Sequence, residues 1–156
     1  MRTLVMSKVL YIWSAMSYNE KSAWAIAGSL LIVSAWYLTT LANEAGGAAV
    51  ATVEYRGLVL VGVVLLAVLA TVTHIVLAVS EPGSAGVADE RDRRYNQLGE
   101  YVGGFVLGSG TLLTLGLAVI EADHFWIGNA ILAALVLSEL TSLGTRILLY
   151  RRGGLV

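Results

Sequence analysis

The chain has 156 residues, of which 57% are hydrophobic and 13% are charged, and its formal net charge is −1. A typical soluble domain carries about 25% charged residues, so this composition excludes most soluble enzymes. It also excludes a disordered chain, which needs low hydrophobicity and high charge. The near-neutral balance does not indicate a nucleic-acid partner. The class that is left is an integral membrane protein with about four bilayer crossings.

Residues 1–22 form an N-terminal segment that is too short to span a membrane. Its first part places Arg2 and Lys8 among aliphatic and aromatic side chains, which is typical of a helix that lies in the membrane interface. A cleaved signal peptide is an alternative, although its apolar core would be short. A further alternative is that translation starts at Met16, because the residues after it resemble a natural N-terminus.

Four apolar segments make up a predicted transmembrane domain over residues 23–153. They are too long for membrane strands and do not alternate in polarity, so we expect helices, whose backbone groups are satisfied within each segment. Of the 21 charged side chains, only Glu139 and Arg146 lie inside the segments. The predicted fold class is all-α, an integral membrane four-helix bundle. The predicted helices cover residues 23–41, 57–79, 101–120 and 126–149.

The distribution of basic residues predicts the orientation of this bundle. Nine of the ten Lys and Arg residues lie before the first segment, between the second and third, or toward the end of the fourth, and the two other connections contain only Arg56. Basic residues collect on the cytoplasmic side of a membrane protein. We therefore expect cytoplasmic N- and C-termini and a multi-pass protein of the cytoplasmic (inner) membrane of a prokaryote.

The connection between the second and third segments, residues 81–100, is the most highly charged part of the chain. We expect a helix that leads into the third segment, capped by Asp89 and carrying favourable pairs four residues apart, Asp89 with Arg93 and Glu90 with Arg94. Such a helix is either a solvated extension or a docking site for a cytoplasmic partner. A metal site is a weaker alternative, because neighbouring arginines would repel the cation. The predicted interaction residues are Asp89, Glu90, Arg91, Asp92, Arg93 and Arg94.

These charged residues also carry a resemblance. The sequence Asp-Glu-Arg-Asp at residues 89–92 precedes a Gly-rich segment, and the last segment contains Ser-Glu-Leu at 138–140 and ends Leu-Leu-Tyr-Arg-Arg-Gly at 148–153. Over roughly residues 16–153 the chain resembles a family of small predicted membrane proteins of unknown function in archaea and bacteria. The resemblance implies a four-helix inner-membrane protein and brings no established activity, ligand or cofactor.

Glu139 lies near the centre of the last segment, where a charged side chain costs about 2.5–3.5 kcal/mol on insertion scales. Counting 1.5 Å per residue from the cytoplasmic ends places one polar side chain of every segment at a similar depth. We therefore predict an intramembrane polar layer that Glu139 joins. The alternative is that the Ser and Thr hydroxyls bond their own helix backbone. The predicted polar residues are Ser34, Thr71, His74, Thr111 and Glu139.

His74 lies closer to the cytoplasmic end of the second segment. It is either a proton relay to Glu139 or an interior histidine that bonds a backbone carbonyl. The chain has two histidines and no cysteine, and His124 lies in the connection on the opposite side. We therefore predict no metal site and no cofactor.

The third segment contains Gly104 and Gly108, a GxxxG pair that lets helices approach closely, with Gly103 and Gly110 on the adjoining face. Gly104 and Gly108 either pack inside the bundle or form the seam of a homodimer.

No Ser, His and acidic residue share a depth that would suit a nucleophile and its base. The sequence thus predicts a non-enzymatic membrane protein that acts by association with a partner or with itself. The expected partners are the lipid bilayer, a homo-oligomer, or another membrane or cytoplasmic protein. The alternative is a component of a proton- or cation-coupled transporter or channel that uses Glu139.

Overall fold

The computed structural model describes residues 18–47, 49, 54–80 and 90–152, and in these residues it contains helices and no strand. Each of the four helices is long and apolar enough to cross a membrane. The all-α, four-helix prediction is therefore confirmed. The helices are α2 (Tyr18–Ala45), α3 (Tyr55–Ser80), α4 (Glu90–Val119) and α5 (His124–Arg151).

The helices extend beyond the predicted apolar segments. Residues 18–22, which the sequence assigns to an interfacial segment, form the start of α2, where Lys21 and Ser22 are buried. The charged connection is likewise part of a helix, since α4 begins at Glu90 and continues without a break into the Gly-rich segment. This confirms the predicted helix that leads into the third segment, whereas Asp89 and residues 1–17 lie outside the described residues.

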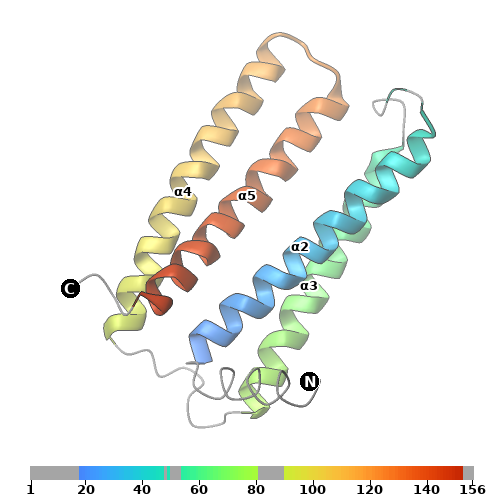
Figure 1. The fold of residues 1–156 in the computed structure, drawn as a ribbon. Helices are drawn as coiled ribbons and strands as arrows, with labels where there is room; N and C mark the ends of the chain where they lie inside the picture. The colour runs from blue at the N-terminus through green and yellow to red at the C-terminus, as the bar shows by residue number, and fades with distance from the viewer. Residues whose placement is uncertain (1–17, 48, 50–53, 81–89, 153–156) are drawn as a thin grey trace, which may run out of the picture.

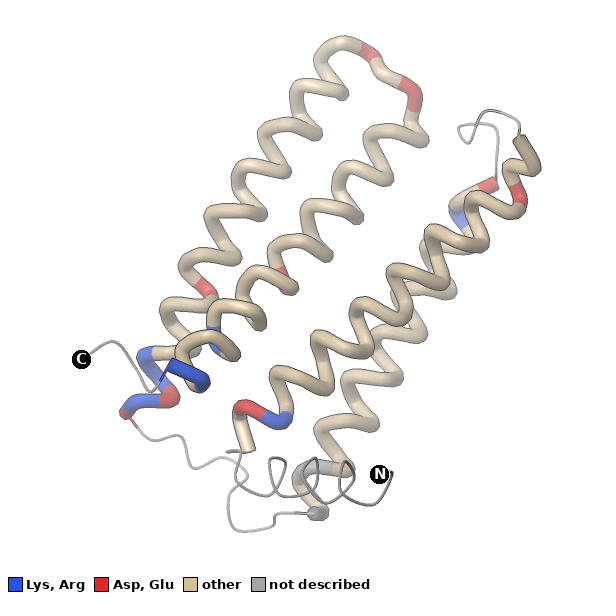
Figure 2. Tube along the Cα trace, in the orientation of Figure 1, with Lys and Arg blue, Asp and Glu red and all other residues tan. Residues whose placement is uncertain are grey.

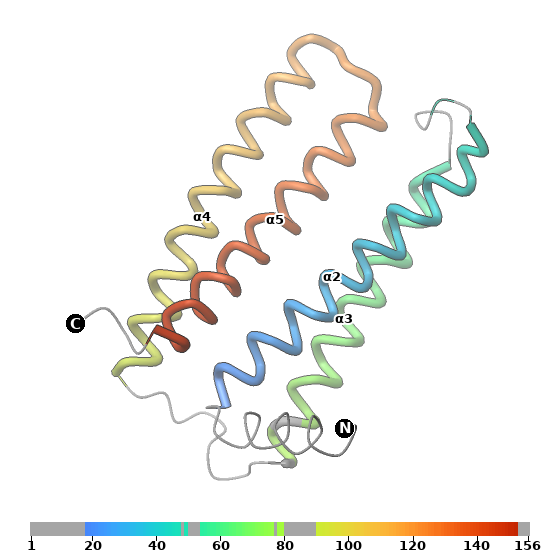
Figure 3. Tube along the Cα trace, viewed as in Figure 1, coloured from blue at the N-terminus to red at the C-terminus, as the bar shows by residue number. Residues whose placement is uncertain are grey.

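The spatial order of the helices differs from their order in the chain. The closest packing joins α4 to α5, then α2 to α3 and α2 to α5, while α3 and α4 share no comparable contact. Figures 1 and 3 show α2 between α5 and α3, with α2 beginning at the same end of the bundle as α5 ends. The described helices therefore do not close into a complete ring.

Small residues of α4 form the seam with α5. A Cβ atom added to Gly103 would lie 2.9 Å from both Ser138 O and Ser142 Cβ, and one added to Gly99 would lie 2.8 Å from Ser142 O. Ser138 Oγ donates a hydrogen bond of 2.9 Å to Gly103 O across the seam. Gly110 is similarly close to Ala134. Glycine is thus required at three positions of α4 because the backbones approach closely.

The turn between α4 and α5 is held by local hydrogen bonds. Asp123 caps α5, because its side chain accepts a bond of 2.8 Å from Phe125 N–H. Glu121 adopts φ 55°, the left-handed region that reverses the chain after α4.

Charged residues lie mainly at the two ends of the bundle (Figure 2). Lys and Arg gather where α2 and α4 begin and α5 ends, and this region is called the basic end below. Between the ends, large apolar side chains face outward, above all on α3, where Leu60 and Val64 are 68% and 60% exposed.

Candidate functional site

The five residues of the predicted polar layer do not meet. Thr71 and Thr111 are exposed, and their hydroxyls donate to the carbonyl oxygens of Ala67 (2.7 Å) and Leu107 (2.8 Å) in their own helices. In the described part of the chain, no hydrogen bond joins any two of the five. The predicted layer is therefore wrong, because equal depth does not make helix faces turn toward one another. Both threonines instead match the alternative prediction, in which the hydroxyl bonds the backbone of its own helix.

His74 and Ser34 lie in different surroundings from each other. His74 is exposed on α3 and makes no hydrogen bond within the described residues, so the interpretation as an interior histidine bonded to a carbonyl is wrong. Ser34 is half-buried on α2 and lines an apolar cavity. Neither side chain contacts Glu139 through a hydrogen bond or ion pair in the described chain.

Among the described helices, Glu139 is the acidic residue that lies farthest from both ends of its helix. It follows the start of α5 at His124 by 15 residues and precedes its end at Arg151 by 12. Its side chain is exposed, and within the described residues it has no hydrogen bond and no ion pair. The single chain thus leaves a carboxyl group uncovered midway along an apolar helix.

Arg146 lies two turns from Glu139 on the same stripe of α5, since residues seven apart share a helix face. Its Nη2 donates to Ser142 Oγ at 3.1 Å and lies 3.6 Å from Glu100 Oε1 of α4. Its Nε is buried without a partner among the described residues. Arg146 therefore bridges α5 to α4 on one side of their seam, and it forms no ion pair with Glu139 among the described residues.

Because Glu100 of α4 and Arg146 of α5 meet, the helix faces that carry them lie on the same side of the α4–α5 pair. On α4, spacings of four and three place Gly104, Gly108 and Thr111 on the stripe that begins at Glu100. On α5, Glu139 continues the stripe of Arg146. We call this surface the open flank; it consists of Gly104, Gly108, Thr111 and Glu139, all of which are exposed.

The expected packing of Gly104 and Gly108 inside the bundle is wrong. A Cβ atom added to either glycine would meet nothing within 4 Å, whereas Gly99, Gly103 and Gly110 are crowded by α5. The glycines of α4 that pack against α5 with a GxxxG spacing are Gly99 and Gly103. They lie on the helix face next to the one that carries Gly104 and Gly108. The homodimer alternative for Gly104 and Gly108 stays a prediction.

At the basic end, Asp92 ties three helices together. Its carboxylate accepts a hydrogen bond of 2.7 Å from Asn19 Nδ2 of α2 and one of 2.6 Å from the Tyr150 hydroxyl of α5. The Tyr150 ring packs edge-to-face on Tyr95, with centroids 5.0 Å apart, and the Arg91 guanidinium lies 5.3 Å from the Tyr95 centroid. Asp92 and Arg91 therefore stabilise the bundle from within the predicted interaction segment.

The other charged residues of that segment face outward. Glu90 and Arg94 form the predicted pair four residues apart, at 3.1 Å between Oε1 and Nη2, and both are largely exposed. Arg93 is also exposed. The predicted pair is confirmed, and a cytoplasmic interaction surface at Glu90, Arg93 and Arg94 stays a prediction.

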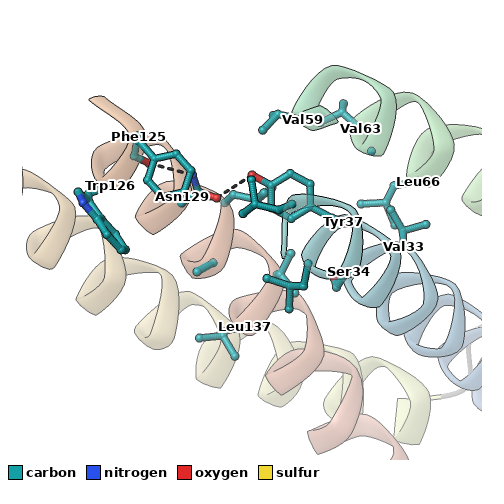
Figure 4. Close-up of a pocket in the computed structure, with 16 residues that line it drawn as sticks. Val33, Ser34, Tyr37, Val59, Val63, Leu66, Phe125, Trp126, Asn129 and Leu137 are labelled. Atoms are coloured by element: carbon teal, nitrogen blue, oxygen red, sulfur yellow. Dashed lines mark hydrogen bonds between the residues drawn. The ribbon is translucent and has the colours of Figure 1, made fainter. Parts of the chain in front are cut away.

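Sequence reasoning missed a polar pair between α2 and α5. The Tyr37 hydroxyl donates to Asn129 Oδ1 at 2.7 Å, and Asn129 Nδ2 donates to Phe125 O at 2.9 Å (Figure 4). The pair borders an apolar cavity of about 440 Å³ between α2, α3 and α5. An Asn inside an apolar segment, at the depth of a Tyr in another, is the signal that would have identified it.

No group of three or more His, Asp or Glu side chains suited to a metal ion occurs in the described ranges. Comparison of the chain with family models, with curated proteins and with solved structures gives no match. The resemblance to a family of small membrane proteins therefore stays a prediction, and the proposals below depend on the structure itself.

Proposed function

We propose that this protein is a multi-pass membrane protein that acts by association within the bilayer, with the open flank as its binding surface. Its partner there is another membrane protein or a second copy, and no reaction is assigned to it. The observation that carries this proposal is the exposed Glu139, which has no partner among the described residues.

Membrane insertion is supported by the outward-facing apolar surface. Soluble proteins rarely expose contiguous apolar patches larger than a few hundred Å². Here large apolar side chains are exposed on all four helices, for example Leu38 on α2, Leu60 on α3, Leu112 on α4 and Leu135 on α5. Lipid is the surrounding that such helices favour. The clustering of Lys and Arg supports a cytoplasmic location for the basic end, and hence for both termini.

The position of Glu139 supports a partner. A centred charge costs about 2.5–3.5 kcal/mol on insertion scales, and such residues normally face protein or water. In the single chain, Glu139 would instead face lipid. A helix seated on the open flank would cover the carboxyl group and supply it with a hydrogen-bond donor.

The neighbouring glycines suit such a helix. Helices associate in lipid through close van der Waals contact and interhelical hydrogen bonds, for which small residues are enriched at interfaces. Gly104 and Gly108 leave space above α4, and Thr111 adds a hydroxyl beside them. The open flank thus combines a small-residue surface on α4 with a polar group on α5.

Co-isolation from the native membrane tests this proposal. A tagged chain is produced beside an untagged or differently tagged copy, and the proteins retained in a mild detergent are quantified. We expect one stoichiometric companion, either the second copy or one other membrane protein. Gly108→Leu should reduce its recovery at least tenfold, because the added side chain blocks close approach, and Glu139→Gln should reduce it to a lesser extent.

Gly116→Leu is the matched control. Like Gly104 and Gly108, Gly116 is an exposed glycine of α4 with nothing within 4 Å of an added Cβ, but it lies off the open flank. Its substitution should leave recovery unchanged. A companion that Gly108→Leu and Gly116→Leu affect equally, or the absence of any companion, would refute association through this surface.

A second candidate function, proton- or cation-coupled transport, is favoured by the depth of Glu139 alone. Carboxylates within membrane helices often mark proton or ion pathways. In proteoliposomes with an imposed pH gradient, this function predicts a proton flux that Glu139→Gln abolishes. Equal flux in the wild type and the variant would rule it out.

A further inference from the structure

The apolar cavity between α2, α3 and α5 has walls on three helices and opens between them. Its lining includes Val33 and Tyr37 of α2, Gly62 and Val63 of α3, and Leu137 of α5. Val63 and Leu137 are more than half exposed, so the cavity communicates with the surroundings of the bundle. Its volume of about 440 Å³ lies within the range of about 300–1,000 Å³ that is usual for small-molecule sites.

A hydrogen-bond donor remains unused at one side of this cavity. Asn129 has two amide N–H groups, of which one donates to Phe125 O, while its Oδ1 accepts from the Tyr37 hydroxyl. The second N–H has no acceptor among the described residues. An amide N–H without an acceptor is unfavourable in an apolar environment. The cavity therefore combines apolar walls with one free donor (Figure 4).

The depth of Asn129 indicates which acceptor it meets. α5 has 28 residues and is thus about 42 Å long, whereas the hydrocarbon core of a bilayer is about 30 Å thick. If α5 is centred, about 6 Å of helix extends beyond the core at each end. Asn129 follows His124 by five residues, or about 7.5 Å. It lies at the boundary of the core, where the oxygen atoms that link lipid chains to glycerol are found.

We propose that this cavity binds one chain of a membrane lipid, whose linkage oxygen accepts a hydrogen bond from Asn129 Nδ2. The apolar chain lies along Val33, Val63 and Leu137, which would otherwise border an empty space. Trp126, also in the lining and half exposed, lies at the same end as Asn129, where aromatic rings favour the interface. The proposal depends on the membrane insertion proposed above and is independent of the partner on the open flank.

The test measures lipid retained by the full-length protein. The protein is reconstituted into vesicles of dioleoyl phosphatidylcholine, extracted with a mild detergent, and examined by native mass spectrometry. We expect one tightly held lipid per chain. Ala133→Phe and Val63→Phe should each reduce its occupancy at least fivefold, because both residues line the cavity and are exposed enough to accept a ring. Ile131→Phe, on the exposed surface of α5 outside the lining, should retain it.

The role of the amide is tested with two further variants. Tyr37→Phe removes the hydroxyl and leaves the Asn129 N–H groups, so the lipid should stay bound. Tyr37→Phe combined with Asn129→Leu removes the donor without leaving an unpaired hydroxyl, and we expect at least a tenfold loss of occupancy. Equal occupancy in these two variants would overturn the hydrogen bond to Asn129.

The lipid site would be refuted by the absence of a retained lipid, or by equal retention in Ala133→Phe, Val63→Phe and Ile131→Phe. Resistance of the protein to alkaline extraction from the vesicles establishes insertion separately. Failure of the lipid site in an inserted protein therefore counts against the cavity alone, while failure to insert counts against the proposed function.

Discussion

Two faces of the same helix, α4, both carry glycines, and they have opposite surroundings. Gly99, Gly103 and Gly110 lie against α5 so closely that a Cβ atom would clash with its backbone or side chains. Gly104 and Gly108 have open space above them. The comparison teaches that a GxxxG spacing indicates a surface for close approach without specifying what approaches. In our account, the first face holds the chain together and the second receives a partner.

The largest effect is expected from filling the covered face. Gly103→Leu would drive a side chain into Ser138 and Ser142 of α5, and overpacking of this kind costs about 1–3 kcal/mol or more. We expect a loss of that size in the free energy of unfolding, measured by circular dichroism during titration with a denaturing detergent. Gly104→Leu is the matched variant on the open face; it gains the same helix propensity without overpacking, so it should not lower the free energy of unfolding. Similar losses in both would abolish the distinction between the faces.

The next effect concerns the basic end, where the same stretch of α4 has an inward and an outward side. Asp92→Ala removes the acceptor for Asn19 and Tyr150, and hydrogen bonds to charged groups contribute about 1.5–3 kcal/mol. Glu90→Ala removes an exposed pair with Arg94, which contributes about 0.3–0.5 kcal/mol. We expect the Asp92 variant to be clearly less stable in the same titration. If Glu90→Ala is as destabilising, the inward role of Asp92 is incorrect.

A smaller difference in stability is expected between two hydroxyl groups of α5, one that bonds across the α4–α5 seam and one that bonds within its own helix. Ser138→Ala removes the bond to Gly103 O and should cost about 0.5–1.5 kcal/mol. Thr141→Val removes a hydroxyl that bonds only the Leu137 carbonyl of its own helix, so little change is expected. Unfolding curves of the two variants provide the comparison. A loss for Thr141→Val equal to that for Ser138→Ala would show that the seam bond contributes nothing.

The sequence was sufficient to predict the four helices. It was not sufficient to predict which face of each helix turns toward its neighbours. Apolar length predicts a spanning helix at α3, but its apolar residues surround the whole helix, so no stripe indicates the side that faces α2. The polar layer failed for this reason, because Thr71 and Thr111 share a depth with Glu139 and face away from the packed core. The Glu90–Arg94 pair was predictable because it depends only on spacing within one helix.

Contacts between segments that are far apart along the chain also could not be predicted from the sequence. Asp92 meets Asn19 and Tyr150, which are 73 and 58 residues away along the chain. Periodicity alone cannot select these pairs among the polar residues near the same end of the bundle. The pair of Tyr37 and Asn129 was more accessible to prediction, since both occur at similar depths within otherwise apolar segments.

The central claim, that another protein helix covers the open flank, is tested most directly by crosslinking in the native membrane. The chain has no cysteine, so one introduced cysteine can carry a benzophenone. Thr111→Cys places the probe on the open flank, and Leu113→Cys places it on the opposite, 73% exposed side of α4. Our account predicts one discrete protein adduct from position 111, lost when Gly108→Leu is added, and lipid adducts alone from position 113. Lipid adducts alone from both positions would contradict it.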